Sequence, residues 1–110
     1  NMRTAIASTG NTLESKVDRR VGRCSYFVIC DEETGSMDFT PNPHKDDEEG
    51  AGPAAVQLVV SKQADQIVSG EFGIKIKSLL DSQRIRMIVI QEEDKKISEI
   101  IELLNHKKTK

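Results

Sequence analysis

Two side chains in this sequence, Cys24 and His44, are of types that bind transition metals. Cys24 follows Arg23 and lies about one turn from Arg20, and positive neighbours favour the thiolate, the form of cysteine that binds metal. His44 lies beside four acidic residues, 46–49, and neutral imidazole is a common ligand of transition metals. Each residue also has a simpler interpretation: a small cysteine packed at the start of a strand, and a solvated loop histidine.

Two further features point to an anionic ligand. Arg19, Arg20 and Arg23 form the only concentrated positive patch, which would either clamp an anion or balance the acidic run. The segment Gly70-Glu71-Phe72-Gly73 lies between a predicted strand and a predicted helix, where backbone amides can face an anion. The alternative for this segment is a tight turn whose Phe72 fills the core, because glycine marks turns more often than binding sites.

The sequence carries no signature of catalysis. A two-metal nuclease needs carboxylates on adjacent strands, whereas the first predicted strand has none and the fourth has only Asp65, at its beginning. The phosphate-loop, dinucleotide-binding, C-x-x-C and H-E-x-x-H patterns are all absent. We therefore expect a protein that binds a ligand and is not an enzyme.

Length and composition predict one globular domain over residues 1–110. The net charge of −2 does not favour binding to nucleic acid, and no segment has the length of a transmembrane helix. With only two cysteines, a reducing cytoplasm is the expected compartment. Asn1 before Met2 is typical of a tag remnant, and residues 106–110 are typical of a frayed tail. We expect the protein to be a monomer or a weak homo-oligomer.

Hydrophobic periodicity predicts the order β-β-β-α-β-α-β-α. The predicted strands cover residues 3–8, 26–31, 37–40, 66–69 and 87–90; the last is an uninterrupted apolar run, typical of a strand covered on both faces. The predicted helices start at Pro53, after Gly73, and after an N-cap at Asp94. The segment 13–22 is predicted to be a loop with a helical turn at 15–17. The segment 44–52 is predicted to be the most mobile internal segment.

A meander followed by two right-handed crossovers predicts a mixed five-stranded sheet of order 3-2-1-4-5 flanked by three helices. This is a ribonuclease-H-like α/β fold. The first and fourth strands then meet at a switch in connectivity, which should open a crevice at their carboxyl ends. Ser8-Thr9-Gly10 and Ser69-Gly70 would rim that crevice.

Several short motifs, none specific alone, occur in an order and spacing that is distinctive over about residues 2–104. They are Ile6-Ala7-Ser8, Ser15-Lys16-Val17, Val21-Gly22-Arg23, Tyr26-Phe27, Asp31, Asn42-Pro43, Gly50-Ala51-Gly52 and Gly70-x-x-Gly73. In these motifs the chain resembles the dinitrogenase iron–molybdenum cofactor biosynthesis proteins, a family of nitrogenase accessory proteins.

The resemblance implies the same ribonuclease-H-like fold and a carrier that holds an iron–sulfur or iron–molybdenum cofactor precursor and passes it to cofactor-assembly proteins. It implies Cys24 and His44 as metal ligands, with Arg20 and Arg23 attracting the anionic cargo and the Gly70 and Gly73 amides beside it. Cys30 should instead be packed within the sheet. The alternative function is a small regulatory or interaction module that binds an anionic metabolite or a partner protein.

Overall fold

The protein is described here by a computed structural model, which covers the backbone of residues 2–108 and the side chains of residues 2–105. Asn1, the expected tag remnant, and the end of the expected frayed tail lie outside the described residues. The strands are β1 (Arg3–Ser8), β2 (Tyr26–Asp31), β3 (Met37–Pro41), β4 (Gln66–Ser69) and β5 (Arg86–Val89). The helices are α1 (Ala51–Ser61), α2 (Ile74–Ser82) and α3 (Ile97–Lys108).

The five strands form one mixed sheet of order β3-β2-β1-β4-β5. β1 pairs antiparallel with β2 and parallel with β4, β2 pairs antiparallel with β3, and β4 pairs parallel with β5. The predicted α/β, ribonuclease-H-like architecture and strand order are confirmed. The two crossovers take the chain outward from β1, first to β4 and then to β5.

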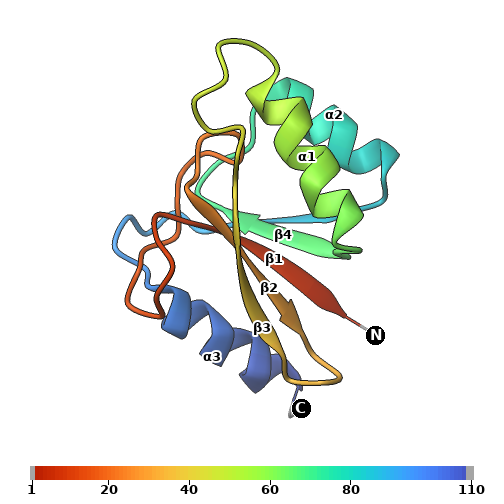
Figure 1. Ribbon diagram of the computed structural model, residues 1–110. Coiled ribbons are helices and arrows are strands. Elements are labelled where there is room, and N and C mark those ends of the chain that lie inside the picture. The colour runs from red at the N-terminus through yellow and green to blue at the C-terminus, as the bar shows by residue number, and fades with distance from the viewer. Residues whose placement is uncertain (1, 109–110) are drawn as a thin grey trace.

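Helices cover both faces of the sheet, α1 and α2 on one and α3 on the other (Figure 1). The α1–α2 face is packed around Phe27, Val56 and Leu80, each fully buried. The α3 face is packed around Ile6 and Ile97, also fully buried. Truncating such an isoleucine to alanine typically costs about 2–5 kcal/mol, so α3 is an integral layer of the fold. No helix among residues 2–108 is long and apolar enough to span a membrane.

Strand β5 differs from its prediction. It begins one residue earlier than expected, and it lies at the edge of the sheet. Both of its faces contact the core as expected, Met87 on the α1–α2 side and Ile88 on the α3 side, but the cover is partial because Val89 is half-exposed. A short apolar run does not by itself distinguish a central strand from an edge strand, because both need apolar residues where helices contact them.

The predicted start of α2 after Gly73 is confirmed, whereas the other two predicted helix starts needed correction. α1 begins at Ala51, so Pro53 occupies its third position, where its missing N–H still leaves no hydrogen bond unmade. Asp94 is not the N-cap of α3, because its carboxylate binds Lys16 Nζ at 3.1 Å. The backbone N–H of Lys96 instead donates to Glu99 Oε1 at 2.9 Å, one half of a capping box.

Candidate functional site

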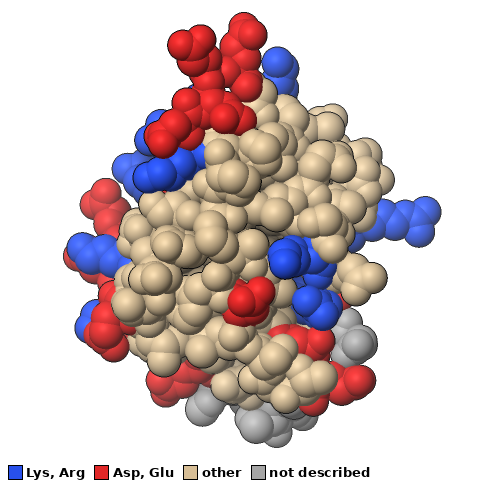
Figure 2. All heavy atoms as spheres, in the orientation of Figure 1, with Lys and Arg blue, Asp and Glu red and all other residues tan. Residues whose placement is uncertain are grey.

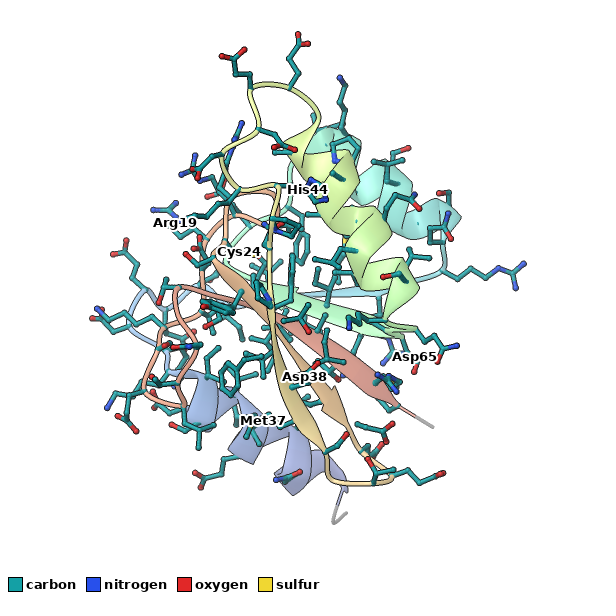
Figure 3. All side chains as sticks on the ribbon, in the orientation of Figure 1. Arg19, Cys24, Met37, Asp38, His44 and Asp65 are labelled. Atoms are coloured by element: carbon teal, nitrogen blue, oxygen red, sulfur yellow. The ribbon has the colours of Figure 1, made fainter. Side chains whose placement is uncertain are left out.

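The carboxyl ends of β1, β3, β4 and β5 share one edge of the sheet, which we call the carboxyl edge. One loop follows each of these ends, at residues 9–25, 42–50, 70–73 and 90–96. Figure 3 shows Arg19, Cys24 and His44 at this end of the molecule, with Met37 and Asp65 far from it. All six predicted site residues belong to these loops: Arg20, Arg23, Cys24, His44, Gly70 and Gly73.

The predicted crevice between β1 and β4 is closed by the first loop. Asp18 N–H donates to Ala7 O at 2.8 Å, and Gly70 N–H donates to Asp18 O at 2.9 Å, so the chain at Asp18 bridges the two strands. Ser8 and Ser69, expected at the rim, are fully buried beneath it. Segment 15–17 is not the predicted helical turn but forms isolated bridges, including Ser8 with Val17. A ligand at this edge must therefore bind to the loops above the crevice.

Gly70, the first glycine of the turn at 70–73, has a chiefly structural role. The N–H groups of Gly70 and Glu71 donate to carbonyls of the first loop, that of Glu71 to Arg19 O at 2.9 Å. A Cβ on Gly70 would lie 2.7 Å from Arg19 Cα, so only glycine permits this approach. Phe72 fills the core, as the simpler interpretation expected. Gly73 starts α2 with no side-chain cap and no acidic residue in the first turn, so free amides remain there for an anion.

Asn42, which we did not single out from the sequence, joins the first two loops. Its Nδ2 donates to Cys24 O at 2.9 Å and to Gly22 O at 3.3 Å, and its Oδ1 accepts from His44 N–H at 3.1 Å. The residue is only 4% exposed. Its one sequence signal is its place before Pro43, in a motif where an asparagine side chain commonly bonds the backbone two residues on.

His44 is held in an orientation suited to a metal ligand. Its Nδ1 lies 3.0 Å from Asp47 Oδ2, and both side chains are partly exposed. A carboxylate partner places the ring proton on Nδ1 and leaves the Nε2 lone pair available. A histidine that ligates a metal commonly has such a carboxylate behind it. The acidic run beside His44 thus supplies a specific partner for the imidazole.

Cys24 departs from its predicted chemistry. It is fully buried, and its Sγ donates to Val21 O at 3.3 Å. Burial, followed by the negative charge of Asp18, raises the pKa of the Cys24 thiol to about 12. The expectation that neighbouring arginines favour the thiolate is wrong, because Asp18 is the charge that acts on the sulfur. In this conformation Cys24 is a core residue beneath the loops.

The arginines of the first loop have different partners. Arg23 Nη1 donates to Lys45 O at 2.8 Å and to Asp47 O at 2.7 Å, so it fastens the His44 loop. Arg19 pairs with Glu71 at 3.1 Å. Arg20 is exposed, and its guanidinium has no ion pair among the described residues. Figure 2 shows acidic side chains at the tip of the 42–50 loop with basic ones just below them.

Among the described residues, the accessible nitrogen and sulfur donors of histidine and cysteine at this edge amount to one imidazole, that of His44. Among the side chains of residues 2–105, no three or more histidine, cysteine, aspartate or glutamate residues are arranged to hold a metal ion. A permanently bound ion with a complete set of protein ligands therefore does not fit the loops.

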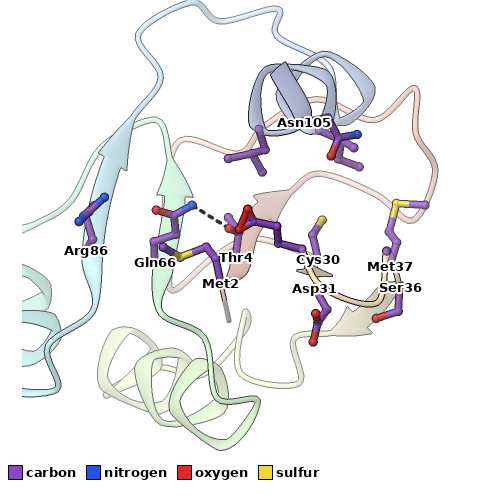
Figure 4. A pocket seen from close by; sticks show the side chains of 13 residues that line it. Met2, Thr4, Cys30, Asp31, Ser36, Met37, Gln66, Arg86 and Asn105 are labelled. Carbon is purple, nitrogen blue, oxygen red and sulfur yellow. Dashed lines mark hydrogen bonds between the residues drawn. The ribbon is translucent and has the colours of Figure 1, made fainter. Parts of the chain in front are cut away.

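A cavity lies at the opposite end of the sheet, beneath α3 (Figure 4). Its volume is about 340 Å³, and Cys30 lines it. Cys30 packs against the α3-side core as expected, but it is not fully buried. Burial raises the pKa of its thiol to about 11. Nothing in the sequence pointed to this cavity, because its walls come from five strands and a helix.

Comparison with known proteins gives a family and a fold. The family model described as dinitrogenase iron-molybdenum cofactor matches residues 2–107. The apo form of the orange protein from Desulfovibrio gigas is 25% identical, with a TM-score of 0.87, over 97% of this chain and 90% of that chain. A NifB candidate protein from Thermotoga is 29% identical, with a TM-score of 0.81, over 96% and 89%. Among proteins with curated descriptions, no sequence matches significantly.

Proposed function

Because this chain belongs to the dinitrogenase iron-molybdenum cofactor family, we propose that it is a non-catalytic carrier of an iron–sulfur or iron–molybdenum cofactor precursor. The cargo binds over the carboxyl edge. It lies between residues 18–24 of the first loop, the 42–50 loop and the start of α2. The carrier then delivers it to cofactor-assembly proteins. The observation that carries this proposal is the His44–Asp47 pair, 3.0 Å from Nδ1 to Oδ2.

The proposed binding has an electrostatic part and a coordinating part. The Arg20 guanidinium and the uncapped amides at the start of α2 attract an anionic cluster. His44 Nε2 then coordinates one metal atom of the cluster. Arg23 acts indirectly by holding the carbonyls of Lys45 and Asp47, which positions the loop that carries the imidazole.

Cys24 is the proposed second ligand, reached only when the turn at 21–24 opens. Its thiol must lose a proton before it binds iron, and its pKa of about 12 in the closed loop keeps that proton in place at neutral pH. Coordination by Cys24 should therefore be slower than coordination by His44 and should release a proton. Because the protein supplies so few ligands, the cargo can later be released to an acceptor.

The test is an anaerobic titration with iron and sulfide, followed by the visible absorbance of the cluster, for the wild type and four variants. We expect a coloured, stoichiometric complex in the wild type and in Cys30→Ser. His44→Ala should lose most of the binding, and Cys24→Ser should lose the slow, proton-releasing phase. Asp47→Asn, which keeps the size of the side chain, should weaken binding about ten-fold or more, the lower end of what loss of a carboxylate behind a metal-bound histidine typically costs.

Loss of binding in Cys30→Ser alone would refute this assignment. If His44→Ala and Cys24→Ser both bind the cluster as tightly as the wild type does, the cargo binds elsewhere. If the wild type binds no cluster, the regulatory alternative, a module for an anionic metabolite or a partner protein, becomes the better explanation.

A further inference from the structure

The floor of the cavity beneath α3 is one row of side chains that crosses the whole sheet. The strand registers pair these residues in sequence from β3 to β5, and all five line the cavity (Figure 4). The row is Met37, Cys30, Thr4, Gln66 and Arg86. Along the row the side chains change from a thioether and a thiol through a hydroxyl and an amide to a guanidinium.

The neighbouring row on the same face is entirely apolar and packed beneath α3. Its members are Phe39, Val28, Ile6, Val68 and Ile88, which the strand registers likewise place side by side. The helix therefore seals one row and leaves the next open, with Ile101 and Leu104 forming the roof of the cavity. A sheet face that served only for packing would be apolar in both rows.

The centre of the floor is polar, although it is buried. Thr4 and Gln66 are 3% and 5% exposed, and Gln66 Nε2 donates to Thr4 Oγ1 at 2.8 Å. This is the only hydrogen bond of the Gln66 side chain among the described residues. Gln66 lines the cavity, and its Oε1 is not among the fully buried side-chain atoms that lack a partner in the described part of the chain. A buried amide with unused hydrogen-bonding capacity favours a guest whose polar end lies next to Gln66.

Charge is distributed unevenly around the cavity. Arg86, on β5, is exposed and has no ion pair within residues 2–105. The acidic lining residues, Asp31 and Glu32, lie at the far side by the β2–β3 hairpin. The Asp31 carboxylate accepts hydrogen bonds from the N–H groups of Glu33 and Thr34 and pairs with Arg3. An anionic group in the cavity is therefore attracted to the β5 end.

We propose that this cavity binds an organic monocarboxylate with an extended apolar body. Its carboxylate pairs with Arg86, and its body lies across Thr4 and Cys30 under Ile101 and Leu104. From Arg86 to Cys30 is three strand spacings, about 14 Å at roughly 4.8 Å each, which is close to the length of a medium-chain fatty acid. A cavity of about 340 Å³ is within the range of small-molecule sites. This site is separate from the carboxyl edge and does not rest on the carrier function.

Isothermal titration with sodium decanoate tests the proposal, with decylamine and acetate as matched probes. Decylamine has the same apolar body with the opposite charge, and acetate has the charge without the body. We expect decanoate to bind one molecule per chain and at least ten-fold more tightly than either of the others. Amide NMR shifts on titration should centre on Thr4, Cys30 and Gln66, and not on His44.

Two pairs of variants give the controls. Arg86→Gln should weaken decanoate binding about ten-fold or more, since a hydrogen bond to a charged group is worth about 1.5–3 kcal/mol. Arg84→Gln removes the same charge from the turn just before β5 and should change binding less than two-fold. Leu104→Trp fills the cavity and should abolish binding, whereas Leu103→Trp, at a half-exposed position outside the cavity lining, should not. Melting temperatures identify any variant that has lost its fold.

Four results would overturn the proposal: no binding of decanoate, equal binding of decylamine or acetate, an equal effect of Arg86→Gln and Arg84→Gln, or shifts centred on the carboxyl edge. None of them bears on cluster binding by His44.

Discussion

Asn42→Asp tests whether the two loops of the candidate site are held together by one buried amide. The substitution keeps the size of the side chain and an oxygen to accept from His44 N–H. It replaces the donor that now faces Cys24 O at 2.9 Å and Gly22 O at 3.3 Å with a second oxygen. Two hydrogen bonds are lost, and a carboxylate faces two carbonyl oxygens at a position that is only 4% exposed.

Each lost bond is worth about 1 kcal/mol, and leaving buried carbonyls without a donor adds to this, so we expect a destabilisation of about 2–4 kcal/mol. For a chain of this size that lowers the melting temperature by about 10–20 °C. The control is Asn11→Asp, which makes the same change at an exposed position with no side-chain hydrogen bond among the described residues.

Urea and thermal unfolding of both variants give the comparison. If Asn42→Asp lies within about 0.5 kcal/mol of Asn11→Asp, the range of an ordinary surface change, then the amide does not hold the loops and the reasoning is wrong.

Three further predictions concern the same edge. Gly70→Ala should destabilise the protein by about 2 kcal/mol or more by overpacking against Arg19, whereas Gly73→Ala, with open space at its Cβ, should cost less than about 1 kcal/mol in unfolding measurements. Stability that depends on the buried Cys24 thiol should be fully present below pH 9 and lost as pH rises toward 12, because folding raises its pKa from 9.0 to about 12; Cys24→Ser should therefore show a flatter stability profile between pH 9 and 11. Amide hydrogen exchange should be fastest at residues 48–50, because Arg23 and Asn42 hold only the first half of the loop, and slow exchange throughout 44–52 would contradict this.

The fold follows from the sequence because it depends on the order of elements and on the handedness of two crossovers. Those rules needed no side-chain detail, and the strand order was predicted correctly. The edge position of β5 follows from the same order, yet its apolar run favoured a covered strand. The hydrophobic pattern of a segment predicts that it is a strand more reliably than it predicts what the strand contacts.

The chemistry of individual residues was harder to predict. Sequence neighbours placed Arg23 beside Cys24, but the guanidinium extends to the 42–50 loop while Asp18 acts on the thiol. The cavity row could not be found from the sequence, because it depends on the registers of four strand pairs. Asn42 was within reach, since an Asn-Pro pair after a strand predicts a bonded side chain.

The central claim is that a metal cluster binds over the carboxyl edge, and an amide NMR spectrum of the anaerobically loaded protein tests it most directly. A paramagnetic cluster broadens the signals of nearby amides. We expect that amide signals from residues 19–24, 44–47 and 72–75 disappear, that those of Thr4, Cys30 and Arg86 persist, and that His44→Ala restores the lost signals. Broadening around the cavity beneath α3, or an unchanged spectrum in protein that has retained iron, would contradict it.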